Sequence, residues 1–355
     1  MANYILVINP GSTSTKVAVY KDTEPVFTEN ISHTREELAP FARITDQYEF
    51  RKNIILKLLE EKHIDPKSLT AVVGRGGLIR PIPSGTYIIN EQMKEDLRKG
   101  LQGEHASNLG GLIADAIASP LNIPAFIVDP VVVDEMEPVA KVTGMPEITR
   151  KSIFHALNHK AVARRAAADL GRPYEELNLI LAHLGGGISI GAHVKGKVVD
   201  VNNALNGDGP FAPERAGTLP AYQLAELIYD GKFDKEKLKK RLAGQGGVVA
   251  HLGVNDMREV VRMIEAGNDK ARLVYEALIY NVAKEIGKLA PVMYGKVDAV
   301  VLTGGLAKDK VFIEKLKERI SYLGKILVYP GEDEMIALAL GALRVLEKKE
   351  EARTY

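Results

Sequence analysis

Two segments of the sequence share one pattern, in which a short apolar run ends in a turn rich in glycine and hydroxyl residues. The first is residues 4–16, YILVINPGSTSTK, and the second is residues 179–187, LILAHLGGG. Asn9 and His183 are 174 positions apart, and the first glycines of the two turns have the same spacing. Strand–glycine–strand arrangements are common, so the similarity of the two segments could be a coincidence. The shared spacing instead favours a duplicated domain with a cleft between the copies.

Strand-like runs alternate with helix-like stretches along the chain, which predicts an α/β fold. We expect strands at residues 5–8, 17–20, 71–73, 125–128, 179–183, 198–201, 297–303 and 326–329. We expect helices at residues 50–61, 107–118, 151–170, 221–229, 256–266, 270–293 and 335–349. A chain of 355 residues is too long for one ordinary core. The expected domains are residues 1–150 with 332–355, and residues 151–331.

Composition excludes several classes of protein. The chain has no cysteine, so it has neither disulfides nor thiolate metal sites. Its formal net charge is +1, and no long basic block suggests nucleic acid or an anionic membrane as a partner. No apolar stretch reaches the roughly 18 residues that a spanning helix needs. We therefore expect a cytoplasmic protein with no nucleic-acid or membrane partner.

The first turn gathers groups that suit a phosphate. Residues 9–16 offer an amide, several hydroxyls, a lysine and backbone N–H groups at the end of a strand. A plain polar hairpin turn is the alternative. Two such turns could grip one polyphosphate from both sides, so the repeated pattern indicates phosphoryl transfer.

A second glycine-containing segment imitates a phosphate-binding P-loop. Residues 191–198 read GAHVKGKV, but Val198 replaces the hydroxyl residue that would hold magnesium. The segment also lies between two expected strands and does not open a helix. A hairpin turn therefore explains it better.

Four motifs, in this order along the chain, resemble those of the acetate and butyrate kinases. They are residues 9–16 (NPGSTSTK), 183–187 (HLGGG), 255–258 (NDMR) and 303–305 (TGG). Three further segments resemble the butyrate kinase branch of that family. They are residues 74–83 (GRGGLIRPIP), 105–111 (HASNLGG) and 209–217 (GPFAPERAG). The resemblance implies two actin-like (ribonuclease H-like) domains with an interdomain cleft, in the superfamily of sugar kinases and chaperone ATPases.

The resemblance also implies roles for individual residues. Catalytic roles fall on Asn9, Arg75, Asp129, His155 and Arg215, and binding of phosphates and substrate on Gly11, Ser12, Ser14, Lys16, His105, His183, Gly185, Gly186 and Gly187. Nucleotide binding falls on Asp256, Arg258, Gly304 and Gly305, and magnesium on Glu332, with Glu334 as the alternative. The implied cofactors are ATP or ADP and Mg²⁺.

Several of these residues have ordinary alternatives. Asp129 and Asp256 would each serve as helix caps, and Arg80 is a substitute for Arg75, whose local sequence departs from that of acetate kinases. His155 and His159 lie four residues apart on one predicted helix face, a spacing that can also bind zinc. His193 and His251 are interpreted as ordinary polar residues.

The implied reaction is reversible transfer of the ATP γ-phosphoryl group to butyrate or a related short or branched-chain fatty acid. Acetate or propionate kinase activity is the nearest alternative. A nucleotide-driven actin-like scaffold would lack acyl phosphate formation, and a sugar kinase would need a general-base aspartate. The family's habit suggests a homodimer or a higher homo-oligomer.

Overall fold

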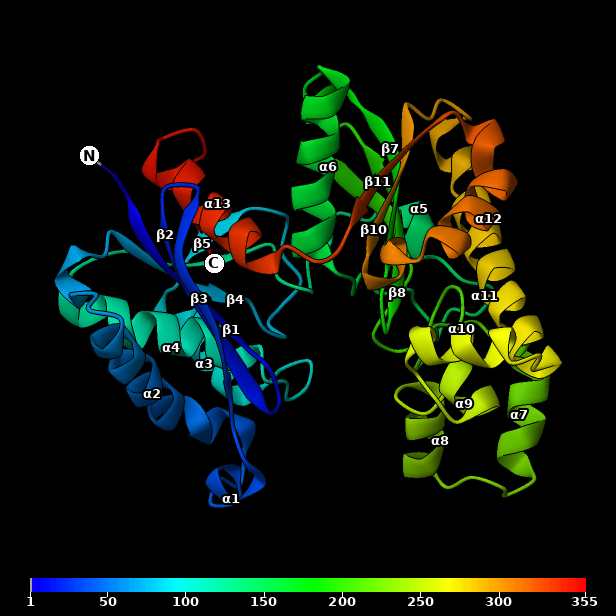
Figure 1. The fold of residues 1–355 in the computed structure, drawn as a ribbon, viewed down its shortest axis with the longest axis horizontal. Coiled ribbons are helices and arrows are strands. Elements are labelled where there is room, and N and C mark those ends of the chain that lie inside the picture. The colour runs from blue at the N-terminus through cyan, green and yellow to red at the C-terminus, as the bar shows by residue number, and fades with distance from the viewer. Residues whose placement is uncertain (1) are drawn as a thin grey trace. The chain divides into compact units, whose positions relative to one another are not determined.

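The computed structural model describes residues 2–355, which form two compact units (Figure 1). The first unit comprises the residues up to Asp134 together with Asp333–Tyr355, and the second is Glu135–Glu332. Each unit is built around one β-sheet with helices on both faces. The predicted α/β fold class is confirmed.

The second unit begins sooner than the boundary after residue 150 that the sequence suggested, because residues 135–150 are tied to its sheet. The Glu135 carboxylate accepts from Val198 N–H at 2.9 Å and pairs with the Lys160 ammonium at 2.6 Å. Glu137 N–H donates to the carbonyl of Val199 at 3.0 Å. The contacts with Val198 and Val199 join the segment to the strand at residues 197–201. No local sequence pattern predicts them, because the two segments are about 60 residues apart.

The first sheet has the order β12-β5-β6-β4-β1-β2-β3. Its strands are β1 (Tyr4–Pro10), β2 (Ser14–Lys21), β3 (Glu24–Ser32), β4 (Ala71–Arg75), β5 (Thr86–Ile88), β6 (Ala125–Val128) and β12 (Arg353–Thr354). Its helices are α1 (Arg35–Leu38), α2 (Tyr48–Glu61), α3 (Glu91–Lys99), α4 (Asn108–Ala118) and α13 (Glu334–Leu346). Helix α4 covers one face with α2 and α3 beside it, and α13 covers the other. Residues 5–8 of β1 are fully buried because both faces are covered.

The second sheet has the order β11-β10-β7-β8-β9. Its strands are β7 (Asn178–Leu184), β8 (Ile188–Val194), β9 (Lys197–Val201), β10 (Ala299–Gly304) and β11 (Lys325–Pro330). Its helices are α5 (Pro138–Lys141), α6 (Ala156–Leu170), α7 (Ala221–Tyr229), α8 (Lys235–Leu242), α9 (Val248–Leu252), α10 (Met257–Glu265), α11 (Asp269–Lys288) and α12 (Lys310–Ile320). Helix α6 packs on one face, and α11 with its neighbour α12 on the other.

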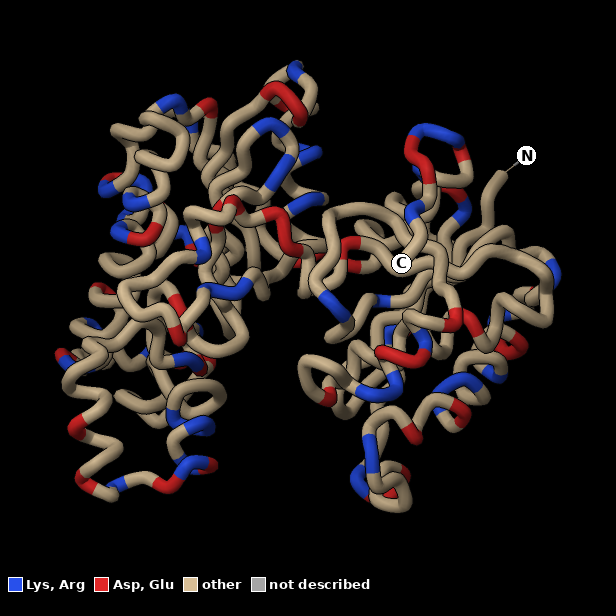
Figure 2. The backbone as a smooth tube through the Cα atoms, turned by 180° about the vertical axis from the view of Figure 1, so that it is seen from behind, with Lys and Arg blue, Asp and Glu red and all other residues tan. Residues whose placement is uncertain are grey.

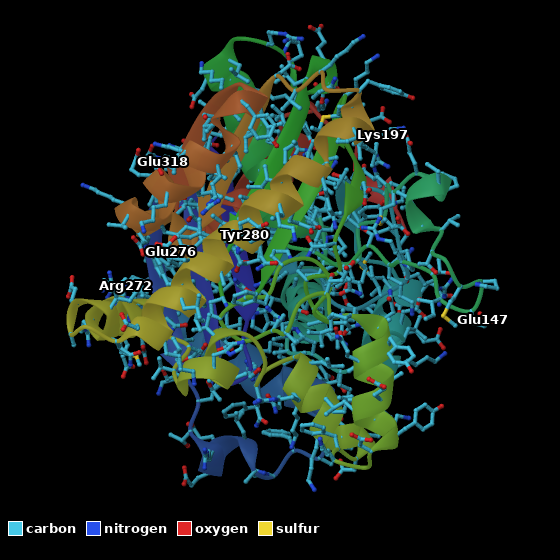
Figure 3. All side chains as sticks on the ribbon, turned by 90° about the vertical axis from the view of Figure 1, so that its right-hand side faces the viewer. Glu147, Lys197, Arg272, Glu276, Tyr280 and Glu318 are labelled. Atoms are coloured by element: carbon cyan, nitrogen blue, oxygen red, sulfur yellow. The ribbon has the colours of Figure 1, made fainter. Side chains whose placement is uncertain are left out.

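The outward face of α11 is mostly polar, as is usual for a helix at the surface of a unit, although Leu273 is 70% exposed. Arg272, Glu276 and Tyr280 follow one another at four-residue spacing along this face (Figure 3). The Tyr280 ring lies 5.3 Å from the Lys284 ammonium and 5.4 Å from the Arg319 guanidinium. Basic and acidic residues are interspersed over both units (Figure 2). Among residues 2–355, no helix is both long and apolar enough to cross a bilayer.

The two sheets repeat one another in detail. Hairpin β1–β2 pairs Tyr4 with Lys21, and hairpin β7–β8 pairs Asn178 with Val194. Both second strands shift register against the third, between Val19 and Tyr20 in one and between Ala192 and His193 in the other. The first strands are therefore offset by 174 positions and the second strands by 173, because the first turn has one more residue. The constant offset inferred from the sequence holds only as far as the turns.

Some predicted boundaries were wrong. The helix expected over residues 151–170 begins at Ala156, and Ser152, Ile153 and Phe154 are buried before it. Helix α12 was missed, as were α3 and α8. The P-loop imitation is a hairpin turn between β8 and β9, with positive φ at Lys195 and Gly196, as predicted.

Candidate active site

Three parallel strands of the first unit end at the same edge of the sheet. β1 runs parallel to β4, and β4 runs parallel to β6, in a register that pairs Ile8 with Gly74 and Arg75 with Val128. Asn9, Arg75 and Asp129 therefore lie at neighbouring strand ends. Ligands of α/β proteins bind at this carboxyl edge, so the sheet gathers three of the predicted catalytic residues where a ligand can be reached.

The first turn of α13 brings a carboxylate to this edge. The Asn9 side-chain amide donates to Glu334 Oε2 at 2.8 Å, and Arg75 Nη1 donates to the same oxygen at 2.8 Å. Arg75 Nη1 also lies 3.3 Å from Asn9 Oδ1. Arg80, the proposed substitute for Arg75, instead pairs with Asp96 at 2.8 Å. Glu334 thus aligns Asn9 and Arg75, and Arg80 is committed elsewhere.

A glycine contact brings the predicted substrate histidine close to Arg75. A Cβ on Gly74 would lie 2.1 Å from the carbonyl oxygen of Gly110, so only glycine lets α4 approach β4 so closely. His105 precedes α4, and its Nδ1 lies 2.8 Å from the Ser107 hydroxyl. Burial lowers the pKa of His105, and the charge of Arg75 lowers it further. His105 is therefore held in its neutral form beside a cation.

Asp129 is almost fully buried, and it does not cap a helix. Its Oδ1 accepts from the Ser84 hydroxyl at 2.6 Å and from Gly85 N–H at 2.8 Å. Its backbone has a φ of 39°, a left-handed conformation that non-glycine residues seldom adopt. No helix begins directly after it. Strained backbone of this kind is concentrated at functional sites.

The first turn is held from beneath by Arg51, a residue that sequence reasoning missed. Arg51 has no exposed surface, and its guanidinium donates to the carbonyls of Gly11, Ser12 and Ser14 at 2.8 to 3.1 Å. It also contacts the Thr15 hydroxyl and the Gln47 amide oxygen. Burial lowers its pKa to about 10. Among the described residues none of its hydrogen-bond partners is a carboxylate, so a cation with no counter-charge lies under the turn.

The Arg51 contacts determine which way the turn's peptide groups point. In a trans peptide the C=O and the following N–H point in opposite directions. Because the carbonyls of Gly11 and Ser12 face Arg51, the N–H groups of Ser12 and Thr13 face away from it. Neither N–H has an acceptor within residues 2–355. Successive outward N–H groups above a buried cation form a nest for an anion, and Lys16 is exposed on β2 just beyond.

The second turn, Gly185–Gly187, leaves the same kind of donors. In the described part of the chain, the N–H groups of Gly186 and Gly187 have no acceptor. The Arg215 guanidinium packs over the turn, and a Cβ on Gly187 would overlap Arg215 Nη1 at 1.5 Å. Burial lowers the pKa of Arg215, which the charge of Glu214 partly offsets. The Arg215 side chain makes no hydrogen bond or ion pair to any residue from 2 to 355, so its fork is available to a ligand.

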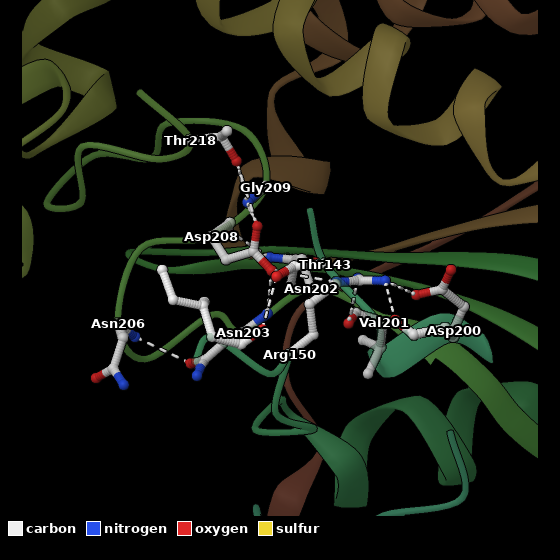
Figure 4. A network of polar contacts seen from close by, with 12 residues as sticks. Thr143, Arg150, Asp200, Val201, Asn202, Asn203, Asn206, Asp208, Gly209 and Thr218 are labelled. Carbon is white, nitrogen blue, oxygen red and sulfur yellow. Dashed lines mark hydrogen bonds and ion pairs between the residues drawn. The ribbon is translucent and has the colours of Figure 1, made fainter. Parts of the chain in front are cut away.

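A polar network supports the loop that carries Arg215 (Figure 4). The Asn202 side chain accepts from Ile190 N–H at 2.7 Å and donates to the carbonyls of Ile188 and Asp208 at 3.0 and 2.8 Å. Asp208 in turn accepts from the N–H groups of Asn203 and Gly209. The loop is thereby tied to β8, the strand that leaves the glycine turn. This fixes Arg215 relative to the turn.

Two predicted histidines stack on one another next to the glycine turn. The rings of His155 and His183 lie 3.8 Å apart at 12°. His183 Nδ1 contacts Asn158 Oδ1 at 2.8 Å, and its Nε2 lies 3.1 Å from Glu332 Oε1 without hydrogen-bond alignment. His155 Nδ1 and His159 Nε2 both contact the Ser189 hydroxyl, at 2.8 and 2.9 Å. His159 and His193 are fully buried and bonded to each other, so His193 is not the ordinary polar residue that the sequence suggested.

A cavity of about 710 Å³ opens beside the glycine turn, within the range of small-molecule sites. Its lining residues include Gly185, Gly186, Glu214, Asn255, Asp256, Arg258, Arg262, Gly305, Leu306 and Lys308. Asp256 caps α10 and also forms an ion pair with Arg258, which lowers the Asp256 pKa to about 2. Gly304 does not line the cavity; a Cβ there would lie 2.4 Å from the Leu184 carbonyl, so it allows β10 to approach β7. Lys308 and Arg262 are cations that the sequence motifs did not include.

The carboxylates predicted for magnesium lie in different settings. Glu332 Oε1 would be 3.1 Å from a Cβ on Gly185, so it lies against the glycine turn, whereas Glu334 Oε2 is occupied by Asn9 and Arg75. Among residues 2–355 no cluster of three metal-binding side chains occurs. Mg²⁺ with a nucleotide needs only one or two protein carboxylates, since phosphates and water complete its shell. Glu332 fits that requirement better than Glu334.

Solved structures share this architecture. Acetate kinase from Porphyromonas gingivalis superposes with a TM-score of 0.79 at 22% identity, covering 97% of this chain and 100% of that chain. A propionate kinase from Francisella tularensis subsp. tularensis SCHU S4 superposes with a TM-score of 0.76 at 22% identity, covering 96% of this chain and 98% of that chain. Acetate kinase from Entamoeba histolytica superposes with a TM-score of 0.78 at 17% identity, covering 97% of this chain and 100% of that chain. The fold is that of two actin-like domains.

The family follows from the sequence. Residues 141–327 match the model of the acetokinase family, a match over more than half of the chain. The chain belongs to that family, whose members transfer phosphoryl groups to short-chain carboxylates.

Proposed function

We propose that this protein is a butyrate kinase, which transfers the ATP γ-phosphoryl group reversibly to butyrate or a related short or branched-chain fatty acid. The observation that carries the kinase chemistry is the glycine turn of the second unit. Among the described residues, two N–H groups of this turn and the Arg215 side chain have no partner, and Gly185 and Gly186 of the turn line the cavity together with Asp256, Arg258 and Gly305. The butyrate assignment is supported by residues 74–83, 105–111 and 209–217, which resemble that branch of the family.

The reaction needs no strong general base, because an ionised carboxylate is already a nucleophile. The carboxylate attacks the γ-phosphorus in line, a bond from carboxylate oxygen to phosphorus forms, and the bond to the β-bridging oxygen breaks with its electron pair leaving on ADP. Positioning and charge neutralisation supply the catalysis. We assign His155 and Arg215, with Asn9 and Arg75, to the equatorial oxygens of the transferring group.

The remaining residues of the proposed site bind the ligands. The turns at Gly11–Ser14 and Gly185–Gly187 would hold phosphate oxygens through their N–H groups, and the cavity would hold the nucleoside. Glu332 would hold a magnesium ion, which when bound neutralises phosphate charge. We further propose that the active protein is a homodimer or a higher homo-oligomer.

The test is a hydroxamate assay that traps the acyl phosphate, run with ATP and a series of acids. The highest kcat/KM is expected with butyrate or isobutyrate. Because one methylene in an apolar pocket contributes only about 1–3 kcal/mol, we expect preferences of roughly 10- to 200-fold. Equal or better turnover with acetate or propionate would overturn the butyrate assignment. ATP hydrolysis without hydroxamate product would instead favour a scaffold ATPase.

One variant, Asp129→Asn, distinguishes a sugar kinase from the carboxylate kinase proposed here. A hydroxyl nucleophile requires a general-base aspartate, whereas the reaction proposed here does not. Asp129→Asn should therefore retain carboxylate phosphorylation, apart from losses due to its contacts with Ser84 and Gly85.

A further inference from the structure

Five side chains of the second unit form one continuous hydrogen-bonded chain that ends at His155. The Tyr174 hydroxyl lies 2.6 Å from His193 Nδ1, and His193 Nε2 lies 3.1 Å from His159 Nδ1. His159 Nε2 lies 2.9 Å from the Ser189 hydroxyl, which lies 2.8 Å from His155 Nδ1. We call these five residues the histidine relay.

The relay follows from the spacing of its residues on two packed elements. His155 caps α6 and His159 lies one turn later, so both rings point the same way along the helix. Ser189 and His193 are four residues apart on β8, which places both on one face of the sheet. The two pairs meet at Ser189, which contacts both His155 and His159, and at His193, which contacts His159.

The interior members of the relay are shielded from water. His159, His193 and Ser189 have no exposed surface, and Tyr174 is 5% exposed. Burial lowers the pKa of His159 and of His193 well below the usual range, and neighbouring positive charges, including that of Lys160, lower both further. Both rings are therefore neutral near pH 7, and each carries one proton.

Proton counting leaves the relay two possible directions. A neutral imidazole has one N–H and one lone pair. Among the described residues the Ser189 hydroxyl contacts no acceptor other than His155 and His159, so its one O–H donates to one of them and each link uses one proton. Phenol is a stronger acid than a neutral imidazole N–H, and an imidazole nitrogen is a better acceptor than a phenol oxygen. The Tyr174 hydroxyl therefore donates to His193 Nδ1. His193 then donates to His159, His159 to Ser189, and Ser189 to His155 Nδ1.

We propose that Tyr174, His193, His159 and Ser189 are positioning residues that fix His155 as its Nε2–H tautomer. The ring of His155 then presents a hydrogen-bond donor, which is what an oxygen of a transferring phosphoryl group requires. The stacked His183, held by Asn158, fixes the plane of the same ring. This inference rests on the proposed function for the role of His155, but the tautomer itself can be measured without any substrate.

The first experiment is a side-chain ¹⁵N spectrum of the whole protein at neutral pH, with His155 assigned by the signals that His155→Gln removes. We expect acceptor-like Nδ1 and protonated Nε2 at His155. Protonation of His155 on Nδ1 would overturn the proposal. If His155→Gln retained full activity, the proposed role of His155 would fail while the tautomer result still stood, so the two failures are distinguishable.

The second experiment breaks the relay at its two ends. Ser189→Ala removes the hydroxyl that donates to His155 Nδ1, so the His155 Nε2–H donor is no longer fixed. Because that donor acts on the transition state, we expect kcat to fall about tenfold, with KM for ATP within about twofold. Tyr174→Phe removes only the distant O–H. A smaller fall in kcat is expected, in proportion to the fraction of His155 left in the competent tautomer.

The matched control is Tyr329→Phe, which removes a hydroxyl that bonds Asp169 outside the relay. Tyr174→Phe should shift the ¹⁵N signals of His155 towards a tautomer mixture, whereas Tyr329→Phe should not. A merely structural role for Tyr174 predicts no such shift, and its absence in a folded Tyr174→Phe protein would overturn the proposal. If Tyr174→Phe failed to fold, unchanged His155 signals in Ser189→Ala would have the same force.

Discussion

The two glycine-containing turns share one hairpin design, but they place their arginine differently. Each turn joins a buried strand to its antiparallel neighbour and leaves two N–H groups that have no acceptor in the part of the chain that the structure describes. In the first, Arg51 lies beneath the turn with every donor group committed to protein oxygens. In the second, Arg215 lies against the turn and makes no hydrogen bond to any described residue.

The difference teaches that a repeated backbone can serve two separate purposes. Arg51 cannot reach a ligand, so it acts by holding carbonyls inward and by adding positive potential under the turn. Arg215 can reach one, because its fork is free. A buried committed arginine affects mainly stability, whereas an available one affects mainly chemistry.

The largest expected effect concerns Arg215, which the comparison assigns to chemistry. Arg215→Ala should lower kcat about 10³-fold, since it removes a fork from the transferring phosphoryl group. Its urea midpoint should hardly change, because no protein hydrogen bond is lost. Arg272→Ala, on the outward face of α11, is the control for loss of an arginine. A fall in kcat of less than tenfold would contradict the assignment.

Arg51 should show the opposite balance. Arg51→Met keeps much of the side-chain volume but leaves the carbonyls of Gly11, Ser12 and Ser14 without their donor. The free energy of unfolding should fall by about 3 kcal/mol, as for other buried charged groups that lose their network. Urea denaturation measures the fall, and Arg51→Lys, which keeps the charge without the fork, should lie between Arg51→Met and wild type. A loss below about 1 kcal/mol would break the comparison.

Gly187 sharpens the comparison by moving Arg215 without deleting it. The Cβ of Gly187→Ala would occupy the position of Arg215 Nη1, and the flexible end of the arginine must move. We expect kcat to fall about 10²-fold with the fold retained. At Gly186 the nearest atom is Glu214 Oε2 at 3.7 Å, an ordinary contact, so Gly186→Ala should lose less than about tenfold. Equal losses would show that the turn, not Arg215, is being disturbed.

The smallest expected effect is the response to acid. His159 and His193 have lowered pKa values in the folded protein, mainly through burial. The unfolded chain binds their protons near pH 6.5 and the folded chain does not, so stability is full above that pH and is lost as the pH falls. The slope approaches about 1.4 kcal/mol per pH unit for each histidine.

Urea midpoints between about pH 7 and pH 5.5 measure this response. The first unit has a counterpart in His33, whose pKa is lowered by burial and by the charge of Arg51. His193→Gln should remove about one proton from the acid response of the protein. An unchanged pH slope in that variant would mean that His193 is not held neutral.

Sequence reasoning proposed site residues that lie in motifs, and it missed the residues that support those motifs from elsewhere. Asn9 and His183 lie near the carboxyl ends of β1 and β7, and Asp256 caps α10, so their places could be inferred from the strand and helix patterns. Arg51 lies in the middle of α2, where a buried arginine looks like any charged residue of an amphipathic helix. The family resemblance assigned Gly304 to the nucleotide, yet the group that lies against it is the Leu184 backbone.

The sequence alone determined the α/β class and the two strand–turn repeats, because apolar periodicity and glycine placement are local properties of a chain. Its motifs also pointed to the acetokinase family. Only the tertiary structure decided that Glu334 joins Asn9 and Arg75, that Arg51 supports the first turn, and that Tyr174 connects to His155 through two buried histidines and Ser189. Such contacts join residues distant in sequence, and their energies depend on burial and orientation, which only the packed chain sets.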